Sequence, residues 1–175
     1  WKKKYKEPAV PNTEDLPKLP KGWVWCRLEQ ISHLITKGSS PKWQGFDYID
    51  NGIVFIRSQN VGWGKLDLTE VAYLPGAFNE KEKKSILKTG DVLLNIVGAS
   101  IGRAAIVPSK AKGGNVNQAV AVIRLVEGGL RNIFLMNYLI STDAQSKIHS
   151  EKVDVARANL SLTDVADLPV PLPPQ

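Results

Sequence analysis

The sequence predicts an α+β fold with a curled, mostly antiparallel sheet and flanking helices. Short apolar runs with strand composition occupy the middle of the chain, from about residue 53 to residue 125. Turns rich in Gly, Asn and Asp separate these runs, and apolar residues at helical spacing occur toward the two ends. Strands in the middle with helices at the ends are typical of α+β domains.

The first expected helix covers residues 28–35, where the apolar side chains are spaced to share one helical face. The loop KGSSPKWQGFDYIDNG follows at 37–52, dense in Gly, Ser, Pro and Asp. The next apolar run, IVFI at 53–56, predicts a strand that becomes polar at Arg57. The apolar residues of the expected helix are Leu28, Ile31, Leu34 and Ile35.

The charged segment NEKEKKSILKTGD, residues 79–91, predicts a surface turn or a short helix. Two strands are then expected, VLLNIVG at 92–98 and RAAIVP at 103–108, on either side of a turn bounded by Gly98 and Gly102. A further strand lies within GGNVNQAVAVIRLVEGG, which begins with an Asn-rich turn and ends with two glycines.

The C-terminal part predicts two helices and an extended segment. NIFLMNYLIST, residues 132–142, has apolar residues at helical spacing and is expected to pack on the sheet. Ser161 is a suitable N-cap for a short helix. The prolines of LPVPLPP, residues 168–174, favour an extended conformation.

Length and composition suit one globular domain with a tail. The chain has 175 residues, 43% of them apolar and 23% charged, which is ordinary for a soluble protein. Residues 1–18 are rich in Lys and Pro and predict an exposed linker, so that the domain covers 19–175. The single cysteine, Cys26, excludes an internal disulfide and predicts a buried thiol. Without an apolar run that could span a bilayer, we expect a cytoplasmic protein.

The net charge of +6 is unevenly distributed. Four lysines of the tail supply most of it, and residues 7–175 carry only +2. Three long segments contain no Asp or Glu: 30–46, 51–66 and 92–126. If these segments converge in the fold, they form one positive face that attracts a phosphate backbone.

Motif spacing argues against several enzyme classes. Three residues separate Gly98 from Gly102 and Arg-Ala follows, whereas a Walker loop needs four residues and then Lys-Ser or Lys-Thr. His33 and His149 are too far apart for a paired metal motif, and His33 is expected at the surface. No G-x-S-x-G motif or dinucleotide fingerprint occurs. We therefore expect a binding module with no catalytic residue, metal or cofactor of its own.

Three polar loops carry groups that suit double-stranded DNA. Arg pairs with guanine, and Asn or Gln with adenine, through two hydrogen bonds each, while Lys and Arg neutralise phosphates. The expected phosphate contacts are Lys37, Lys42, Lys65, Arg103 and Lys112. The expected base contacts are Arg57, Gln59, Asn60 and Asn117. Further expected contacts are Ser39, Ser40, Trp43, Ser58, Trp63, Ser100, Asn115 and Gln118.

Several other interpretations stay open at this point. The Gly-Ser-Ser-Pro loop is equally consistent with a structural role, Trp63 with a hydrophobic plug, and Asn117 with a cap on a strand end. Arg103 can form a salt bridge with Asp91 or Asp47. A nuclease or methyltransferase domain using Glu82 or Asp91 is the enzymatic alternative. A protein-interaction domain that docks a partner on exposed Trp43 and Trp63 is the third hypothesis.

The order of several segments resembles a known family. LPKGWVWCRLEQI, GSSP, GIVFIRSQNV, LKTGDVLLNIVGASIGRAAIV and NVNQAVAVIRL are followed by the exit NLSLTDVADLPVPLPPQ. This order is similar to that of a target recognition domain in the specificity subunit of Type I restriction-modification enzymes. The likeness runs from about Leu19 to Gln175, which is nearly the whole chain.

The resemblance implies that the chain reads one half of a bipartite DNA site. It implies partners as well, namely modification subunits that use S-adenosylmethionine and restriction subunits that use ATP and magnesium. The resemblance also implies that the glycine turn before Arg103 belongs largely to the scaffold and that specificity lies in variable loops. The family usually continues into a spacer helix, which we expect to follow residue 175 in the parent protein.

Overall fold

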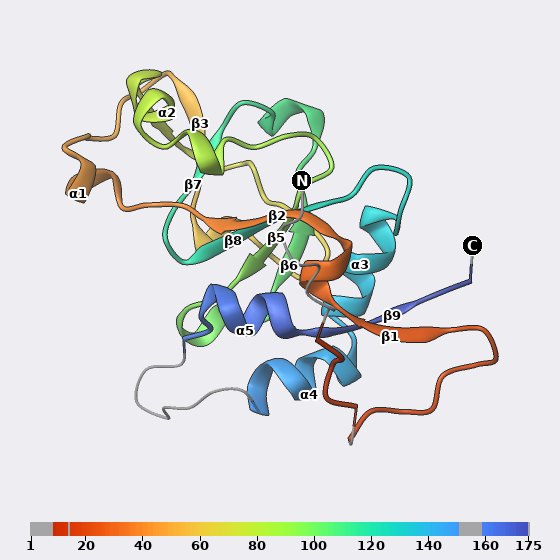
Figure 1. Cartoon of the computed structure of the whole chain (residues 1–175). Coiled ribbons are helices and arrows are strands. Elements are labelled where there is room, and N and C mark those ends of the chain that lie inside the picture. The colour runs from red at the N-terminus through yellow and green to blue at the C-terminus, as the bar shows by residue number, and fades with distance from the viewer. Residues whose placement is uncertain (1–8, 14, 151–158, 175) are drawn as a thin grey trace, which may run out of the picture.

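The computed structural model describes residues 9–13, 15–150 and 159–174. Its central element is a four-stranded antiparallel sheet in the order β2-β8-β5-β6 (Figure 1). The strands are β2 Ser32–Lys37, β8 Val120–Leu125, β5 Val92–Asn95 and β6 Ala104–Ile106. The two outer strands thus come from distant parts of the chain, and β8 and β5 lie between them.

Two smaller sheets flank the central one. In the first, β3 Ile53–Ile56 lies between β4 Ala72–Leu74, which is antiparallel to it, and β7 Asn115–Val116, which is parallel. In the second, β1 Val24–Arg27 pairs antiparallel with β9 Pro169–Leu172 near the other end of the chain. These sheets confirm the α+β fold with mostly antiparallel pairing.

Five α-helices surround the strands in the described residues (Figure 1). Helix α2 lies with β3 and β7 above the central sheet in that view, and α4 and α5 lie below it. Of these helices, α1 and α4 are absent from the expected elements, since α1 lies within the segment expected as a loop. The helices are α1 Pro41–Gln44, α2 Ala77–Lys81, α3 Asn132–Leu139, α4 Thr142–Ser150 and α5 Leu162–Asp167.

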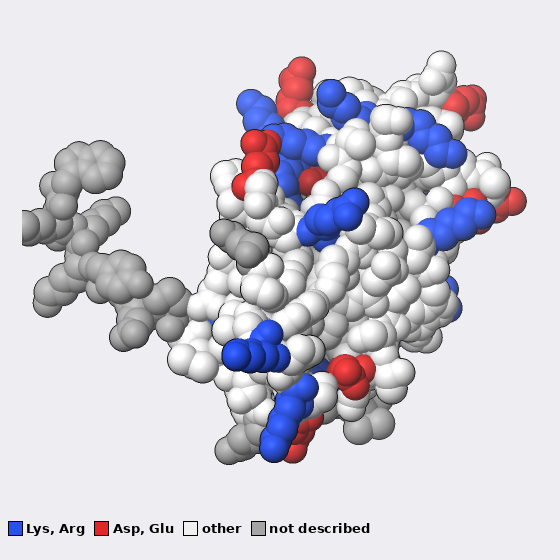
Figure 2. All heavy atoms as spheres, turned by 90° about the vertical axis from the view of Figure 1, so that its right-hand side faces the viewer, with Lys and Arg blue, Asp and Glu red and all other residues white. Residues whose placement is uncertain are grey.

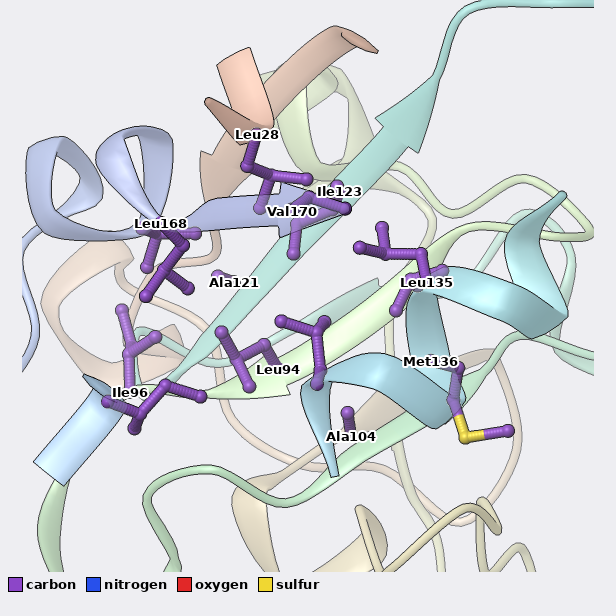
Figure 3. Packing of buried hydrophobic residues seen from close by; sticks show 14 of the residues in the cluster. Leu28, Leu94, Ile96, Ala104, Ala121, Ile123, Leu135, Met136, Leu168 and Val170 are labelled. Atoms are coloured by element: carbon purple, nitrogen blue, oxygen red, sulfur yellow. The ribbon is translucent and has the colours of Figure 1, made fainter. Parts of the chain in front are cut away.

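Both faces of the central sheet are buried. Leu94 and Ile123 pack on one face against side chains of α3 and β9 such as Leu135 and Val170 (Figure 3). Leu93 faces the other way and packs in a second cluster that includes residues of β3 and β7. Since a strand covered on both sides has no polar face, the run VLLN is apolar at three consecutive positions.

The helix expected at 28–35 is wrong. Leu28–Ile31 forms one 3₁₀ turn, and the chain then becomes strand β2, with a register shift between Ser32 and Leu34. Apolar spacing of 28, 31, 34 and 35 suits a helix, but it also suits a buried turn followed by a strand. Pairing with β8 decides between them, because it bonds the backbone and places Ile35 against the core.

The other expected elements form where the sequence indicates them. The IVFI, VLLN, AAI and VAVIRL strands, helix α3 and the proline-bounded β9 are all present. At α5, Ser161 Oγ accepts a hydrogen bond from Asp164 N at 3.1 Å, and the Asp164 carboxylate accepts one from Ser161 N at 2.7 Å. Cys26 is buried, and its burial raises the pKa of the thiol. His33 is exposed, although on a strand.

The expected linker, residues 1–18, lies only partly within the described residues. Residues 1–8 and 14 lie outside them. The remaining part is mostly exposed, but Pro11 is buried and the Ala9 carbonyl accepts a hydrogen bond from Gln30 Nε2 at 3.3 Å. Of the helices in the described ranges, none has the length and apolar character needed to cross a membrane.

Arg124 and Asp91 form a salt bridge that joins the end of β8 to the turn before β5. The guanidinium donates from Nε and Nη2 to the two carboxylate oxygens, each at 2.8 Å, and the Asp91 side chain is 1% exposed. Lys88 N also donates to Asp91 Oδ2 at 2.7 Å. The buried carboxylate is therefore paired with a cation, and both of its oxygens accept hydrogen bonds.

Replacing Arg124 with Met should lower the free energy of unfolding by about 3 kcal/mol or more, because an unpaired carboxylate stays buried. Urea denaturation followed by circular dichroism measures the change. Arg131→Met, at an exposed arginine, is the matched control and should change stability by about 0.5 kcal/mol or less. Adding Asp91→Asn to Arg124→Met should restore part of the loss. Equal stability of the Arg124 and Arg131 variants would contradict a stabilising role for the pair.

Candidate nucleic-acid interface

The polar loops meet at one end of the central sheet because its strands are antiparallel. β2 and β5 end where β8 and β6 begin, as shown by the pairs Lys37 with Ala121 and Leu94 with Ala104. β3 reaches the same end, since the Ile56 carbonyl accepts a hydrogen bond from Asn117 N at 2.9 Å. We call this region the loop end and define it as residues 37–40, 57–60, 95–103 and 117–119.

Hydrogen bonds tie the loops of the loop end to one another. Asn95 Nδ2 donates to the Ser58 carbonyl at 2.8 Å, which joins the end of β5 to the turn after β3. Ile96 N donates to the Ala119 carbonyl at 2.9 Å, which joins the segment after β5 to the start of β8. Segments that are far apart in the sequence are therefore held as one surface.

Gly38 holds the first loop against β7. A Cβ atom at this position would lie 1.7 Å from the Val116 carbonyl oxygen, far inside van der Waals contact. The glycine is needed here for close backbone approach, since its φ lies outside the left-handed region. The backbone after Lys37 is thus pressed directly onto the strand that leads to Asn117.

The turn at 98–102 is anchored by core packing and by a hydrogen bond from α4. Ile101 is 2% exposed and packs in the core, so the middle of the turn points inward. Gln145 of α4 donates from Nε2 to the Gly102 carbonyl at 2.9 Å and to the Leu139 carbonyl at 2.7 Å. Gly98 and Gly102 have φ of +73° and +89°, which glycine adopts without strain.

Arg103 follows this anchored turn and is half-buried. Within the described ranges no salt bridge joins it to Asp91 or Asp47, and the Asp91 carboxylate is occupied by Arg124. Lys37 is half-buried as well, and it forms no salt bridge with any residue that the structure describes. Both cations are held at the surface without being neutralised by a described carboxylate.

The charge of the loop end differs from that of the face shown in Figure 2. The four segments of the loop end contain Lys37, Arg57 and Arg103 and no Asp or Glu. Figure 2 shows the face on the side of the C-terminus in Figure 1, whereas the loop end lies on the left of Figure 1. On that face Lys and Arg are interspersed with Asp and Glu among wide uncharged areas.

A comparison with protein families assigns the domain. Residues 20–175 match the model of the Type I restriction modification DNA specificity domain. The chain belongs to this family. The match confirms the resemblance that the sequence motifs indicate, over almost the same residues.

Curated relatives of this specificity domain are considerably longer. The Type I restriction enzyme EcoBI specificity subunit of Escherichia coli is 34% identical over 157 residues, which cover 89% of this chain and 32% of that protein. The putative type I restriction enzyme MjaX specificity subunit of Methanocaldococcus jannaschii is 26% identical over 174 residues, covering 97% of this chain and 40% of the relative. The chain thus spans about a third of the length of these relatives.

Solved structures of low sequence identity share the fold of the specificity domain. A chain from a structure of the type I R-M system superposes with a TM-score of 0.67 at 20% identity, over 92% of this chain and 36% of that one. The HsdS subunit from Thermoanaerobacter tengcongensis superposes with a TM-score of 0.60 at 20% identity, over 91% and 35%. These likenesses support the architecture described above.

Several of the predicted contact residues lie at the loop end of the specificity domain. Gln59 and Gln118 are exposed, and Arg57 and Asn117 are half-buried. Arg57 Nη2 donates to the Glu70 carbonyl at 3.1 Å, and Asn117 Oδ1 accepts from Ala119 N at 3.2 Å, as expected for a cap at a strand start. The other predicted residues at this end are Lys37, Ser39, Ser40, Ser58, Ser100 and Arg103.

Two predicted contacts are wrong because the side chains are enclosed. Asn60 is 4% exposed and donates from Nδ2 to the carbonyls of Asp67 and Glu70 at 3.2 and 3.1 Å. Asn115 is fully buried and donates from Nδ2 to Asn79 Oδ1 at 2.8 Å. Both amides support loops from inside and do not reach a ligand on the surface.

The remaining predicted residues lie beside the loop end or away from it. Lys42 and Trp43 are exposed on α1, which projects at the left of Figure 1. Trp63, 54% exposed, and Lys65 belong to a turn held to the start of β6 by the Gly64 N–H, which donates to the Ala104 carbonyl at 2.8 Å. Lys112 follows β6 at the opposite end of the sheet, where Gly113 N donates to the Leu87 carbonyl. The expectation of one shared face is therefore wrong for Lys112.

The two carboxylates considered for catalysis serve the structure. Glu82 is 7% exposed and accepts a hydrogen bond from Gln44 Nε2 at 2.8 Å, and Asp91 pairs with Arg124. Across the described residues, no group of three or more His, Cys, Asp or Glu side chains is placed to hold a metal ion.

Gly38→Ala should lower the free energy of unfolding by about 1–3 kcal/mol, because the added methyl group must push the loop away from Val116. Chemical denaturation measures the loss. Gly76→Ala is the matched control, since its φ is −56° and a Cβ there meets nothing within 4 Å. The control should change stability by about 0.5 kcal/mol or less. If both variants are equally stable, Gly38 does not fix the loop as described.

Proposed function

We propose that this domain binds double-stranded DNA and reads one half of a bipartite site for a Type I restriction-modification complex. The observation that carries the proposal is the loop end, where the ends of three strands that carry Lys37, Arg57 and Arg103 lie together in segments without acidic residues. Membership of the specificity-domain family supports a DNA ligand rather than another polyanion.

The loop end is wider than a duplex groove, so its separate loops would enter the groove while its outer parts contact the phosphates. Four strands about 4.8 Å apart place their ends across about 14 Å, whereas the major groove of B-DNA is about 12 Å wide. Lys37 and Arg103 are suited to phosphate contacts because they are partly exposed at strand ends and lack a described carboxylate partner. Gln59, Asn117 and Gln118 offer amides that can pair with base edges.

The chain acts as a non-catalytic module in this proposal. Modification and restriction subunits of the cytoplasmic complex would supply S-adenosylmethionine, ATP and magnesium chemistry. Two assays test this part of the proposal: methyl transfer from labelled S-adenosylmethionine, and DNA cleavage in the presence of magnesium. Turnover by the isolated chain in either assay would show that the module is catalytic and would refute this part.

Selection from randomised duplexes at physiological salt tests the proposal directly. The expected result is enrichment of one short sequence, with an affinity well above that for unselected DNA. Physiological salt matters because the cations of the salt compete with Lys and Arg for the phosphates, which weakens sequence-independent binding. Binding to all duplexes with equal affinity would overturn the proposed function.

Arg103→Ala should weaken binding to every duplex and reduce the slope of log affinity against log salt by about 1, because one phosphate contact is lost. Fluorescence anisotropy over a salt series measures both quantities. Lys112→Ala removes the same charge at the opposite end of the sheet and is the matched control. An equal change of slope in the two variants would show that only net charge matters.

Gln59→Ala should change which sequence is preferred while leaving the salt slope unchanged, because an exposed amide reads a base edge and carries no charge. Competition between the selected duplex and single-base variants measures the preference. The loss should be about 1–3 kcal/mol at one base pair and small elsewhere. The assignment fails if Gln59→Ala and Arg103→Ala lose affinity equally on every sequence.

A further inference from the structure

Helix α1 lies at the tip of an excursion, residues 38–52, that is firmly braced from behind. Pro41 is buried at the first helical position. Gln44 Nε2 donates to Ser39 Oγ at 2.9 Å and to Glu82 Oε1 at 2.8 Å. Lys81 Nζ donates to the Gln44 carbonyl at 2.9 Å, so the C-terminal end of this short helix is attached to the body of the domain.

Aromatic packing fixes the part of the excursion that follows α1. The Phe46 ring lies edge-on to the Phe78 ring with centroids 5.5 Å apart, and Phe78 stands in the same relation to Phe55 of β3. Lys81 Nζ lies 5.9 Å from the centre of the Phe46 ring. The excursion is therefore a rigid projection supported by the β3 sheet.

Trp43 stands on this projection without a partner for its ring. Its side chain is 85% exposed, and none of the aromatic pairs among the described residues includes it. An indole held in water on a braced helix contributes little to folding, because it buries almost no apolar area. The bracing by Pro41, Gln44 and Phe46 keeps its position fixed before any ligand arrives.

We infer that Trp43 is an aromatic wedge that stacks on a base at an opened step of the bound duplex, beside the sequence read by the loop end. The inference rests on the proposed function. Apolar side chains placed between base steps unstack them and kink the duplex, and stacking on a base stabilises the complex. The cost of opening depends on the step, so Trp43 contributes to specificity without a hydrogen bond to a base.

Position and charge favour a duplex as the occupant. The close contact of Gly38 with Val116 ties the start of the excursion to the loop end, so α1 continues the same surface. Lys42 precedes the indole, and residues 30–46 contain no acidic side chain. A phosphate backbone that reaches Lys37 can therefore continue past Lys42 and present its bases to the ring.

The test uses the selected duplex with 2-aminopurine placed at each adenine position in turn. Unstacking from a neighbouring base raises the fluorescence of 2-aminopurine and stacking on an indole lowers it, so the wild-type chain should change the fluorescence at one position near an end of the recognised sequence. Trp43→Ala should remove that signal and weaken binding by about tenfold or more. Trp43→Phe keeps an aromatic ring and should retain most of both.

Tyr48→Ala is the matched control on the same excursion. Tyr48 is 51% exposed, but it lies between Asp47 and Asp50, whose charges repel phosphate, and its ring lies against Phe55. The control should bind and report as the wild type does. A duplex with an abasic site at the opened step should bind the wild-type chain more tightly, because less stacking must be broken to admit the ring. The affinity of Trp43→Ala for this duplex should be almost the same as for the intact one.

Wild-type affinity and signal in Trp43→Ala would overturn the inference, and a partner protein would then be the better occupant of the indole. Loss of affinity with the 2-aminopurine signal intact would also overturn it, since the ring would then contact the backbone. Failure of the proposed function is seen separately, as absence of any selected sequence for the wild-type chain, and the inference falls with it.

Discussion

Burial of the central sheet on both faces is the constraint on which the rest of the structure depends. Leu93 and Leu94 are adjacent in β5, point to opposite faces, and are both fully buried in separate clusters. Around the two central strands neither face is free for a ligand, so the groups of these strands that can contact one must lie at strand ends or beyond them. Antiparallel order then brings alternate strand ends together, and the loop end follows from the topology.

Neutral amides hold the loop end in place. Asn95 bonds the Ser58 carbonyl, Gln145 bonds the Gly102 carbonyl, and Asn60 spans the carbonyls of two residues in the segment after its own turn. An aspartate could satisfy backbone N–H groups at such places, but it could not donate to carbonyls, and its charge would repel phosphate. Amides therefore brace the loops while leaving the surface positive.

The sequence predicts most strands because buried strands are recognisable as short apolar runs, as in IVFI and VLLN. It also predicts α5, whose capping box is local. It fails for residues 28–35, where pairing with a strand about 90 residues away decides the conformation. Asn115 fails for the same reason, because its partners Asn79 and Glu82 are over 30 residues distant. Lys112 is misplaced because an acid-free segment can run the length of the sheet.

The arrangement separates the residues that fold the domain from those suited to reading a sequence. Gln59 and Gln118 are exposed at the loop end, and no described residue accepts a hydrogen bond from either side chain. Substituting them removes no support from the scaffold, so their stability cost is small. By contrast, Asn95 and Gly38 cannot change without moving a loop. Under the proposed function, a fold built in this way can exchange the sequence that it reads through a few exposed side chains while its sheet and loop supports stay the same.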